Sequence, residues 1–103
     1  MQLSEQDQLF FKEKAVQAAA FLRTVGNEHR LLVLCLLIEN KEMGVGELLK
    51  YVSLSQSALS QHLAKMREEG LVAHRRESQM LYYRIADPNV EKLIRTIKAI
   101  YCP

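Results

Sequence analysis

The sequence predicts a mainly α-helical domain with one β-hairpin, in the order four helices, hairpin, helix (ααααββα). Three observations lead to this fold class. Apolar residues recur at helical spacing over most of the chain, two short alternating runs flank Ser78-Gln79, and only four Gly and two Pro interrupt the 103 residues. We expect a single domain, residues 1–103, because the chain is too short for two independent cores.

The composition excludes several classes of protein. There is no run of 18 uncharged apolar residues, and the start, MQLSEQDQLFFKEK, has acids where a secretory signal is basic. We therefore expect no membrane segment and a cytoplasmic location. Two cysteines are too few for a disulfide scaffold. The formal net charge is only +2, but residues 55–86 hold five basic and three acidic side chains.

The N-terminal half of the chain predicts two long helices. The run Ser4-Glu5-Gln6-Asp7 resembles a capping box and begins a helix over about 5–24. Gly26-Asn27 ends this helix, and Asn27 can cap the next one. The unbroken apolar run 31–38 is compatible with a buried strand, but its leucine content favours a helix covered on all sides, at the centre of the core. Residues 41–46 are predicted to form a loop.

Residues 45–69 have the pattern of a helix-turn-helix. A short helix over 45–52 is followed by the turn Ser53-Leu54-Ser55 and by a helix over 56–69, which Gly70 ends. The first helix places Leu48, Leu49 and Val52 inward. In the second, the inward stripe is Leu59, Leu63 and Met66, and the opposite face carries short or amide side chains.

The C-terminal third predicts a hairpin and a last helix. The alternating runs 72–77 and 80–86 form a hairpin around Ser78-Gln79. Asp87-Pro88 supplies a cap and a first-turn proline for a helix over 88–101. Its apolar stripe consists of Val90, Leu93, Ile94, Ile97, Ile100 and Tyr101.

Residues 27–86 resemble the winged helix-turn-helix repressors of the ArsR/SmtB family. The resemblance lies in NEHRLLVLCLL, in VGELLKYVSLSQSALSQHLAKMREEGLV and in RRESQMLYYRI. It implies that the hairpin, residues 72–86, is the wing of a winged helix-turn-helix. It also implies a homodimer in which the segments 1–24 and 88–103 form the interface. Such an interface gives the two terminal apolar stripes a place to be buried.

The dimensions of B-form DNA make the helix from Gln56 the predicted reader of base pairs. A major groove about 12 Å wide admits one helix, Gln pairs bidentately with adenine, and Ser accepts several bases. The predicted base-facing residues are Gln56, Ser57, Ser60 and Gln61. The predicted phosphate contacts are Lys65, Arg67, Arg75 and Arg76. For His62, packing and a phosphate contact are both left open.

The predicted partner is a pseudo-palindromic operator in double-stranded DNA. The wing, residues 75–79, would lie beside or in the minor groove, although Glu77 weakens its positive charge. A two-fold dimer would present its two reading helices about 34 Å apart, one helical turn of DNA.

The metal-ligand patterns of the family are missing. Residues 46–52 contain no thiol and residues 88–101 no histidine, so no metal and no cofactor is predicted. The positions of Cys35 and Cys102 resemble the metal-free BigR/SqrR-type and HlyU-type branch, in which such a pair responds to persulfides, polysulfides or oxidants. The resemblance implies that the reduced protein represses and that a bridged Cys35–Cys102 pair releases the operator.

Other readings of the cysteines and of the surface stay open. Cys35 lies among apolar residues, so both cysteines can be structural in a constitutive regulator. A metal sensor that combines Cys102 with ligands from both subunits is the runner-up within the regulators. An enzyme is not predicted, because no glycine-rich phosphate loop or Cys-His-acid grouping is evident. A protein-interaction module would leave the polar face of the helix from Gln56 unused.

Overall fold

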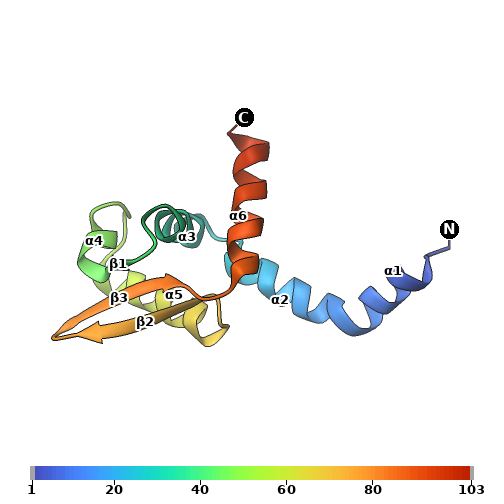
Figure 1. Cartoon of the computed structure of the whole chain (residues 1–103), viewed down its shortest axis with the longest axis horizontal. Helices are drawn as coiled ribbons and strands as arrows, with labels where there is room; N and C mark the ends of the chain where they lie inside the picture. Colours follow the sequence, from blue (N-terminus) through green and yellow to red (C-terminus); the bar gives the residue numbers. More distant parts are fainter. Residues whose placement is uncertain (1, 103) are drawn as a thin grey trace.

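The computed structural model describes residues 2–102 (Figure 1). Met1 and Pro103, the end residues of the predicted segments 1–24 and 88–103, lie outside the described residues. The elements in order are α1 Glu5–Leu9, the π-helical segment η1 Phe10–Lys14, α2 Ala15–Val25, α3 Glu28–Asn40, β1 Met43–Gly44, α4 Val45–Leu49, α5 Gln56–Glu68, β2 Val72–Glu77, β3 Met80–Ile85 and α6 Pro88–Tyr101. The predicted mainly helical fold with one hairpin is confirmed.

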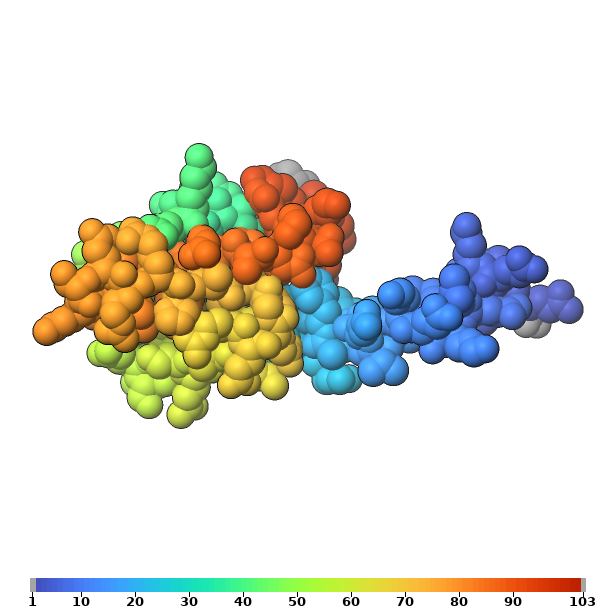
Figure 2. All heavy atoms as spheres, turned by 60° about the horizontal axis from the view of Figure 1, so that its bottom comes forward, coloured from blue at the N-terminus to red at the C-terminus, as the bar shows by residue number. Residues whose placement is uncertain are grey.

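The N-terminal helix projects from the body as an arm, formed by α1, η1 and the first half of α2 (Figures 1 and 2). Ser4 begins it as predicted, since its Oγ accepts a hydrogen bond from the Asp7 amide at 3.1 Å. The predicted helix over about 5–24 is present, because α1, η1 and α2 follow one another without a gap from Glu5 to Val25, although η1 is π-helical rather than α-helical. No Gly or Pro marks this change, so the apolar periodicity gave no sign of it.

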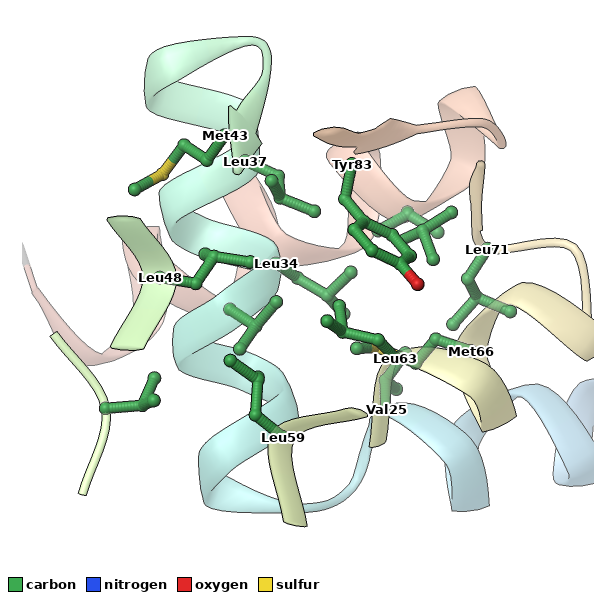
Figure 3. Packing of buried hydrophobic residues seen from close by; sticks show 14 of the residues in the cluster. Val25, Leu34, Leu37, Met43, Leu48, Leu59, Leu63, Met66, Leu71 and Tyr83 are labelled. Carbon is green, nitrogen blue, oxygen red and sulfur yellow. The ribbon is translucent and has the colours of Figure 1, made fainter. Parts of the chain in front are cut away.

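Helix α3 is the centre of the hydrophobic core. Asn27 caps it by accepting hydrogen bonds from the amides of His29 and Arg30. The fully buried side chains of α3, Val33, Leu34 and Leu37, meet core residues of α5 and β3 (Figure 3). The prediction that apolar neighbours cover this helix on all sides is wrong, because Leu32 is 39% exposed. One side of α3 therefore remains open in the single chain.

Strand β1 lies within the segment 41–46 that was predicted to be a loop. It pairs antiparallel with β3, Met43 opposite Tyr83 and Gly44 opposite Tyr82, in a three-stranded sheet of order β1-β3-β2. Two residues are too few to show an alternating pattern, so the sequence did not reveal this strand. Met43 is buried and extends the core to the sheet.

The helix-turn-helix consists of α4 and α5. Helix α4 ends at Leu49, earlier than predicted, yet Leu48 and Val52 are both buried. The predicted inward stripe of α5 is confirmed, because Leu59, Leu63 and Met66 are fully buried. Gly70 ends the helix region with a φ of 78°, and the Leu71 amide donates to the Met66 carbonyl at 2.9 Å. This left-handed turn directs the chain into β2.

The wing and the last helix complete the fold. Strands β2 and β3 pair from Val72 opposite Ile85 to Glu77 opposite Met80, so the predicted hairpin is confirmed. Asp87 caps α6 by accepting a hydrogen bond from the Asn89 amide at 2.9 Å. The first turns of α6 pack on the core, with Val90 and Ile94 buried, and its C-terminal end projects from the body (Figure 1). None of the helices in residues 2–102 combines the length and apolar character needed to cross a bilayer.

Candidate nucleic-acid interface and thiol pair

The side of α5 that faces away from the core carries an exposed polar surface. Ser55 caps the helix, with its Oγ accepting from the Ala58 amide at 3.1 Å. The four predicted base-facing residues are all exposed there, and we name them the reading face: Gln56, Ser57, Ser60 and Gln61. The buried stripe on the opposite side of α5 holds this face outward. The structure thus brings the four candidates together on one solvent-facing surface.

A depression of about 300 Å³ separates the reading face from the wing. Gln56 and Ser60 form one side, and Gln79 and Met80 at the tip of the hairpin form the other. The wing and α5 therefore flank the same depression of the surface.

The predicted phosphate contacts are all exposed but differ in their partners. The Lys65 ammonium lies 3.3 Å from a carboxylate oxygen of Glu69, one turn further along α5. The Arg67 guanidinium hydrogen-bonds to the His74 ring at 2.6 Å. Arg76 makes no ion pair or side-chain hydrogen bond within residues 2–102. Of these three charges, that of Arg76 is the most available to a ligand.

Arg75 lies between two carboxylates. Its Nε and Nη2 donate to the two oxygens of Glu42 at 3.0 and 2.8 Å, and its Nη1 donates to Glu77 at 2.7 Å. The guanidinium also covers the Tyr82 ring, 4.7 Å from its centroid. These hydrogen bonds lower the pKa of Glu42 and raise the pKa of Arg75. We call this group the wing clamp, because it joins β2 to the residue before β1.

His62 packs on the first turn of α3, which is one of the two roles that the sequence left open. Its Nδ1 accepts a hydrogen bond from Arg30 Nε at 3.0 Å, and its ring centroid lies 5.9 Å from that of His29. Burial lowers the pKa of His62, and the nearby Arg30 charge lowers it further. The neutral ring therefore serves as an acceptor that orients Arg30.

The two cysteines lie on α3 and at the end of α6, two helices that contact each other. Cys35 is half-buried on α3, Cys102 is exposed at the end of α6, and both are free. Burial is the main cause that raises the pKa of Cys35, the positive charge of Lys98 lowers it, and the charges of Glu39 and Cys102 raise it. Lys98 of α6, one turn before Cys102, lies 3.4 Å from a carboxylate oxygen of Glu39, one turn after Cys35. Helices α3 and α6 are therefore in contact within about one helical turn of each cysteine. Within residues 2–102, no three metal-ligating side chains converge.

A second basic site lies beyond the end of the reading face, and Lys65 is the one residue of its lining to which the sequence assigned a role. A depression of about 320 Å³ between α2, α3 and α5 is lined by Ala20, Arg23, Thr24, Arg30, Lys65 and Glu69. We name it the junction pocket. Arg23 and Arg30 are far from the helix-turn-helix in sequence, and only the packing of α2 and α3 on α5 places them beside Lys65.

Comparison with known proteins identifies the family. The family model described as bacterial regulatory protein, arsR family, matches residues 27–74. The HTH-type transcriptional regulator YgaV of Escherichia coli is 45% identical over 89 residues, which are 86% of this chain and 90% of YgaV. The chain belongs to the ArsR family. It is a transcriptional regulator, and DNA binding is the common property of such helix-turn-helix proteins.

Solved structures of other regulators resemble this ArsR-family chain over nearly its whole length. Reduced HlyU from Vibrio cholerae has a TM-score of 0.84 at 40% identity, covering 92% of this chain and 99% of HlyU. The transcriptional repressor BigR from Xylella fastidiosa has a TM-score of 0.84 at 31% identity, covering 98% and 99% of the two chains. The winged helix-turn-helix fold and the resemblance to the HlyU and BigR branch are confirmed.

Proposed function

We propose that this ArsR-family regulator is a homodimeric repressor that reads a pseudo-palindromic operator with the reading face of α5, and that Cys35 and Cys102 control its affinity for DNA. The observation that carries the proposal is the reading face itself. Four exposed amide and hydroxyl side chains occupy one side of a helix, with basic side chains at its end and on the adjacent wing. This arrangement suits base contacts in a major groove and phosphate contacts at its edges.

The exposed apolar side chains support a homodimer. In the N-terminal arm Val16 is 79% exposed, and at the end of α6 Tyr101 is 78% exposed. Leu9, Phe10, Phe11, Leu22 and Ile100 are exposed as well. A single chain leaves this surface in water at a cost of about 25 cal/mol per Å², and a second copy can bury it. The dimer would then place two α5 helices on successive turns of one DNA face.

The proposed chemistry at the thiol pair begins at Cys102. Its side chain is exposed, whereas burial raises the pKa of Cys35 and reduces the fraction of Cys35 thiolate. The Cys102 thiolate attacks a sulfane sulfur of an inorganic polysulfide, an S–S bond of the polysulfide breaks, and a shorter polysulfide leaves. The product is a Cys102 persulfide. The Cys35 thiolate then attacks Sγ of Cys102, and hydrosulfide leaves.

The product ties α3 to α6. Both thiols have been oxidised to one disulfide, and the polysulfide sulfur has been reduced to hydrosulfide. Because α6 contributes to the proposed dimer interface and α3 is the core of each subunit, the bond changes how the two α5 helices lie relative to one another. A coupling free energy of about 1 to 3 kcal/mol would lower operator affinity about 5- to 150-fold.

The direction of regulation is part of the proposal. The HlyU relative is described as a transcriptional activator and the BigR relative as a transcriptional repressor. We assign repression to this chain, with the reduced form bound to DNA and the bridged form released. Expression of a reporter gene placed behind the selected operator shows directly whether the reduced protein represses or activates.

The test combines operator selection with thiol chemistry. A duplex selected from random sequences by the reduced protein is titrated before and after treatment with inorganic polysulfide, and each product is weighed by intact mass spectrometry. We expect C35S and C102S to bind like the reduced wild type and to keep that affinity after treatment. Loss of two hydrogens in the wild type, together with weaker binding that dithiothreitol reverses, supports the switch. Unchanged wild-type affinity after bridging would show that the cysteines are structural.

A further inference from the structure

We propose that the junction pocket binds a phosphate group of the DNA backbone, at the edge of the groove that the reading face occupies. The inference rests on the proposed DNA binding and extends its contact surface to α2 and α3. None of the residues first expected to touch DNA is on either helix, so the proposal assigns Arg23 and Arg30 a role that only the packing of the helices reveals.

The charges of the junction pocket favour an anion. Arg23, Arg30 and Lys65 line it together with one carboxylate, Glu69. That carboxylate is already engaged, because the Thr24 hydroxyl donates to one of its oxygens and Lys65 lies 3.3 Å from the other. Arg23 makes no ion pair or side-chain hydrogen bond within residues 2–102, so its guanidinium is available to a ligand.

Arg30 is held in an orientation that leaves part of its guanidinium available. Nε donates to His62 Nδ1 at 3.0 Å, and Nη1 donates to the Thr24 carbonyl at 3.1 Å. Nη2 has no hydrogen-bond partner within the part of the chain that the structure describes. A guanidinium fixed by two neutral acceptors keeps its full positive charge and loses little side-chain entropy when it binds a phosphate.

The pocket lies where the backbone of a bound duplex would run. Lys65 follows Gln61 by four residues on the same side of α5, a distance of roughly 6 Å along the helix axis. The N-terminal residues of a recognition helix contact base edges, so the following turns approach the groove edge and its phosphates. Figure 2 shows the C-terminal part of α5 and the α2–α3 junction side by side on one face of the molecule.

The salt dependence of DNA binding tests the proposal. The variants R23Q and R30Q are compared with K41Q, which removes a positive charge from the residue that follows α3, outside the reading face, the wing and the two predicted dimer segments. Association constants for the selected operator and for an unrelated duplex are measured between about 50 and 200 mM salt. Each phosphate contact adds about 0.9 to the magnitude of the negative slope of log K against log salt. A dimer that loses one contact in each subunit should therefore have a slope about 1.8 smaller in magnitude.

We expect R23Q and R30Q to reduce the slope on both duplexes and K41Q to leave it unchanged. Circular dichroism and thermal melting check that R30Q is folded, and R23Q replaces a side chain that makes no ion pair or side-chain hydrogen bond within residues 2–102. Slopes of R23Q and R30Q equal to that of K41Q would overturn the proposal while DNA binding itself stands. A wild type without salt-dependent duplex binding would instead refute the proposed function. Perturbation of the Arg30 side-chain resonance by inorganic phosphate, with an unchanged R23Q slope, would indicate a free-anion site and also overturn it.

Discussion

Arg75 and Glu42 are joined by two hydrogen bonds, at 3.0 and 2.8 Å, from the guanidinium of one to both carboxylate oxygens of the other. Arg75 belongs to β2, and Glu42 lies between the end of α3 and β1. This pair fastens the wing to the short segment that follows α3, the helix that carries Cys35. The wing and the end of α3 are therefore linked by side chains as well as by the short sheet.

The wing clamp predicts that E42Q weakens DNA binding. Removal of a negative charge near DNA should by itself strengthen binding, so a weaker complex would reveal a positioning role for Glu42. We expect a decrease of up to about fivefold, the size of a well-formed surface pair. Fluorescence anisotropy with the operator duplex measures it. The control E39Q removes a carboxylate that pairs with Lys98, and tighter binding by E42Q than by E39Q would contradict the prediction.

The thiols are predicted to differ in reactivity. At neutral pH iodoacetamide should label Cys102 before Cys35, because Cys102 is exposed and burial raises the pKa of Cys35. Peptide mapping over time gives both rates. In K98A the labelling of Cys35 should slow further, since the Lys98 charge lowers the Cys35 pKa. Faster labelling of Cys35 than of Cys102 in the wild type would reverse the proposed order of attack.

His62 predicts a loss of stability in mild acid. Its pKa in the folded protein is below the ordinary value of 6.5, so the unfolded chain binds more protons in the interval between the two values. The stability that neutral His62 adds to the folded protein is fully present above about pH 6.5 and is lost as the pH falls below that value. Urea unfolding of wild type and H62Q between pH 8 and 5 should show a smaller decrease for H62Q, whose amide oxygen still accepts from Arg30. If the free energy of unfolding decreases equally with pH in the two proteins, His62 does not have this role.

Two glycines provide a matched test of backbone strain. An added Cβ meets no atom within 4 Å at either Gly46 or Gly70, but only Gly70 has a positive φ, 78°. We expect G70A to lower the free energy of unfolding by about 1 kcal/mol and G46A to raise it by about 0.4 to 1 kcal/mol. Chemical denaturation measures both. Equal effects of the two substitutions would mean that conformation at residue 70 is not the cause.

The proposed dimer predicts that a charge on the arm separates the subunits. V16D should shift the molecular mass found by light scattering from two chains toward one, because a carboxylate in an apolar interface is costly. Circular dichroism should change little, since Val16 is exposed in the single chain. The variant S78D, which adds the same charge at the tip of the wing, should remain dimeric. A dimeric V16D would place the interface elsewhere.

Local signals explain why most of the fold could be predicted from the sequence. Ser4, Asn27 and Asp87 cap helices through bonds to amides two or three residues away, and the buried stripe of α5 repeats within one helix. Strand β1 escaped prediction because two residues carry no periodicity, and η1 because no breaker residue marks it.

The site could be predicted only in part. The reading face follows from the spacing of side chains on one helix. By contrast, the pairing of Arg75 with Glu42 and of Arg30 with His62 joins residues separated by 33 and 32 positions. Such contacts depend on how elements pack, and charge or residue type alone does not select one partner among several.

The N-terminal arm has a consequence for the life of the newly made chain. Its side chains find little support from the rest of the subunit, so an unassembled molecule offers a long, accessible helix to cellular proteases. Pairing with a second copy would shield it. The abundance of such a regulator would then depend on how quickly two copies associate after synthesis, and chains that find no partner would be degraded.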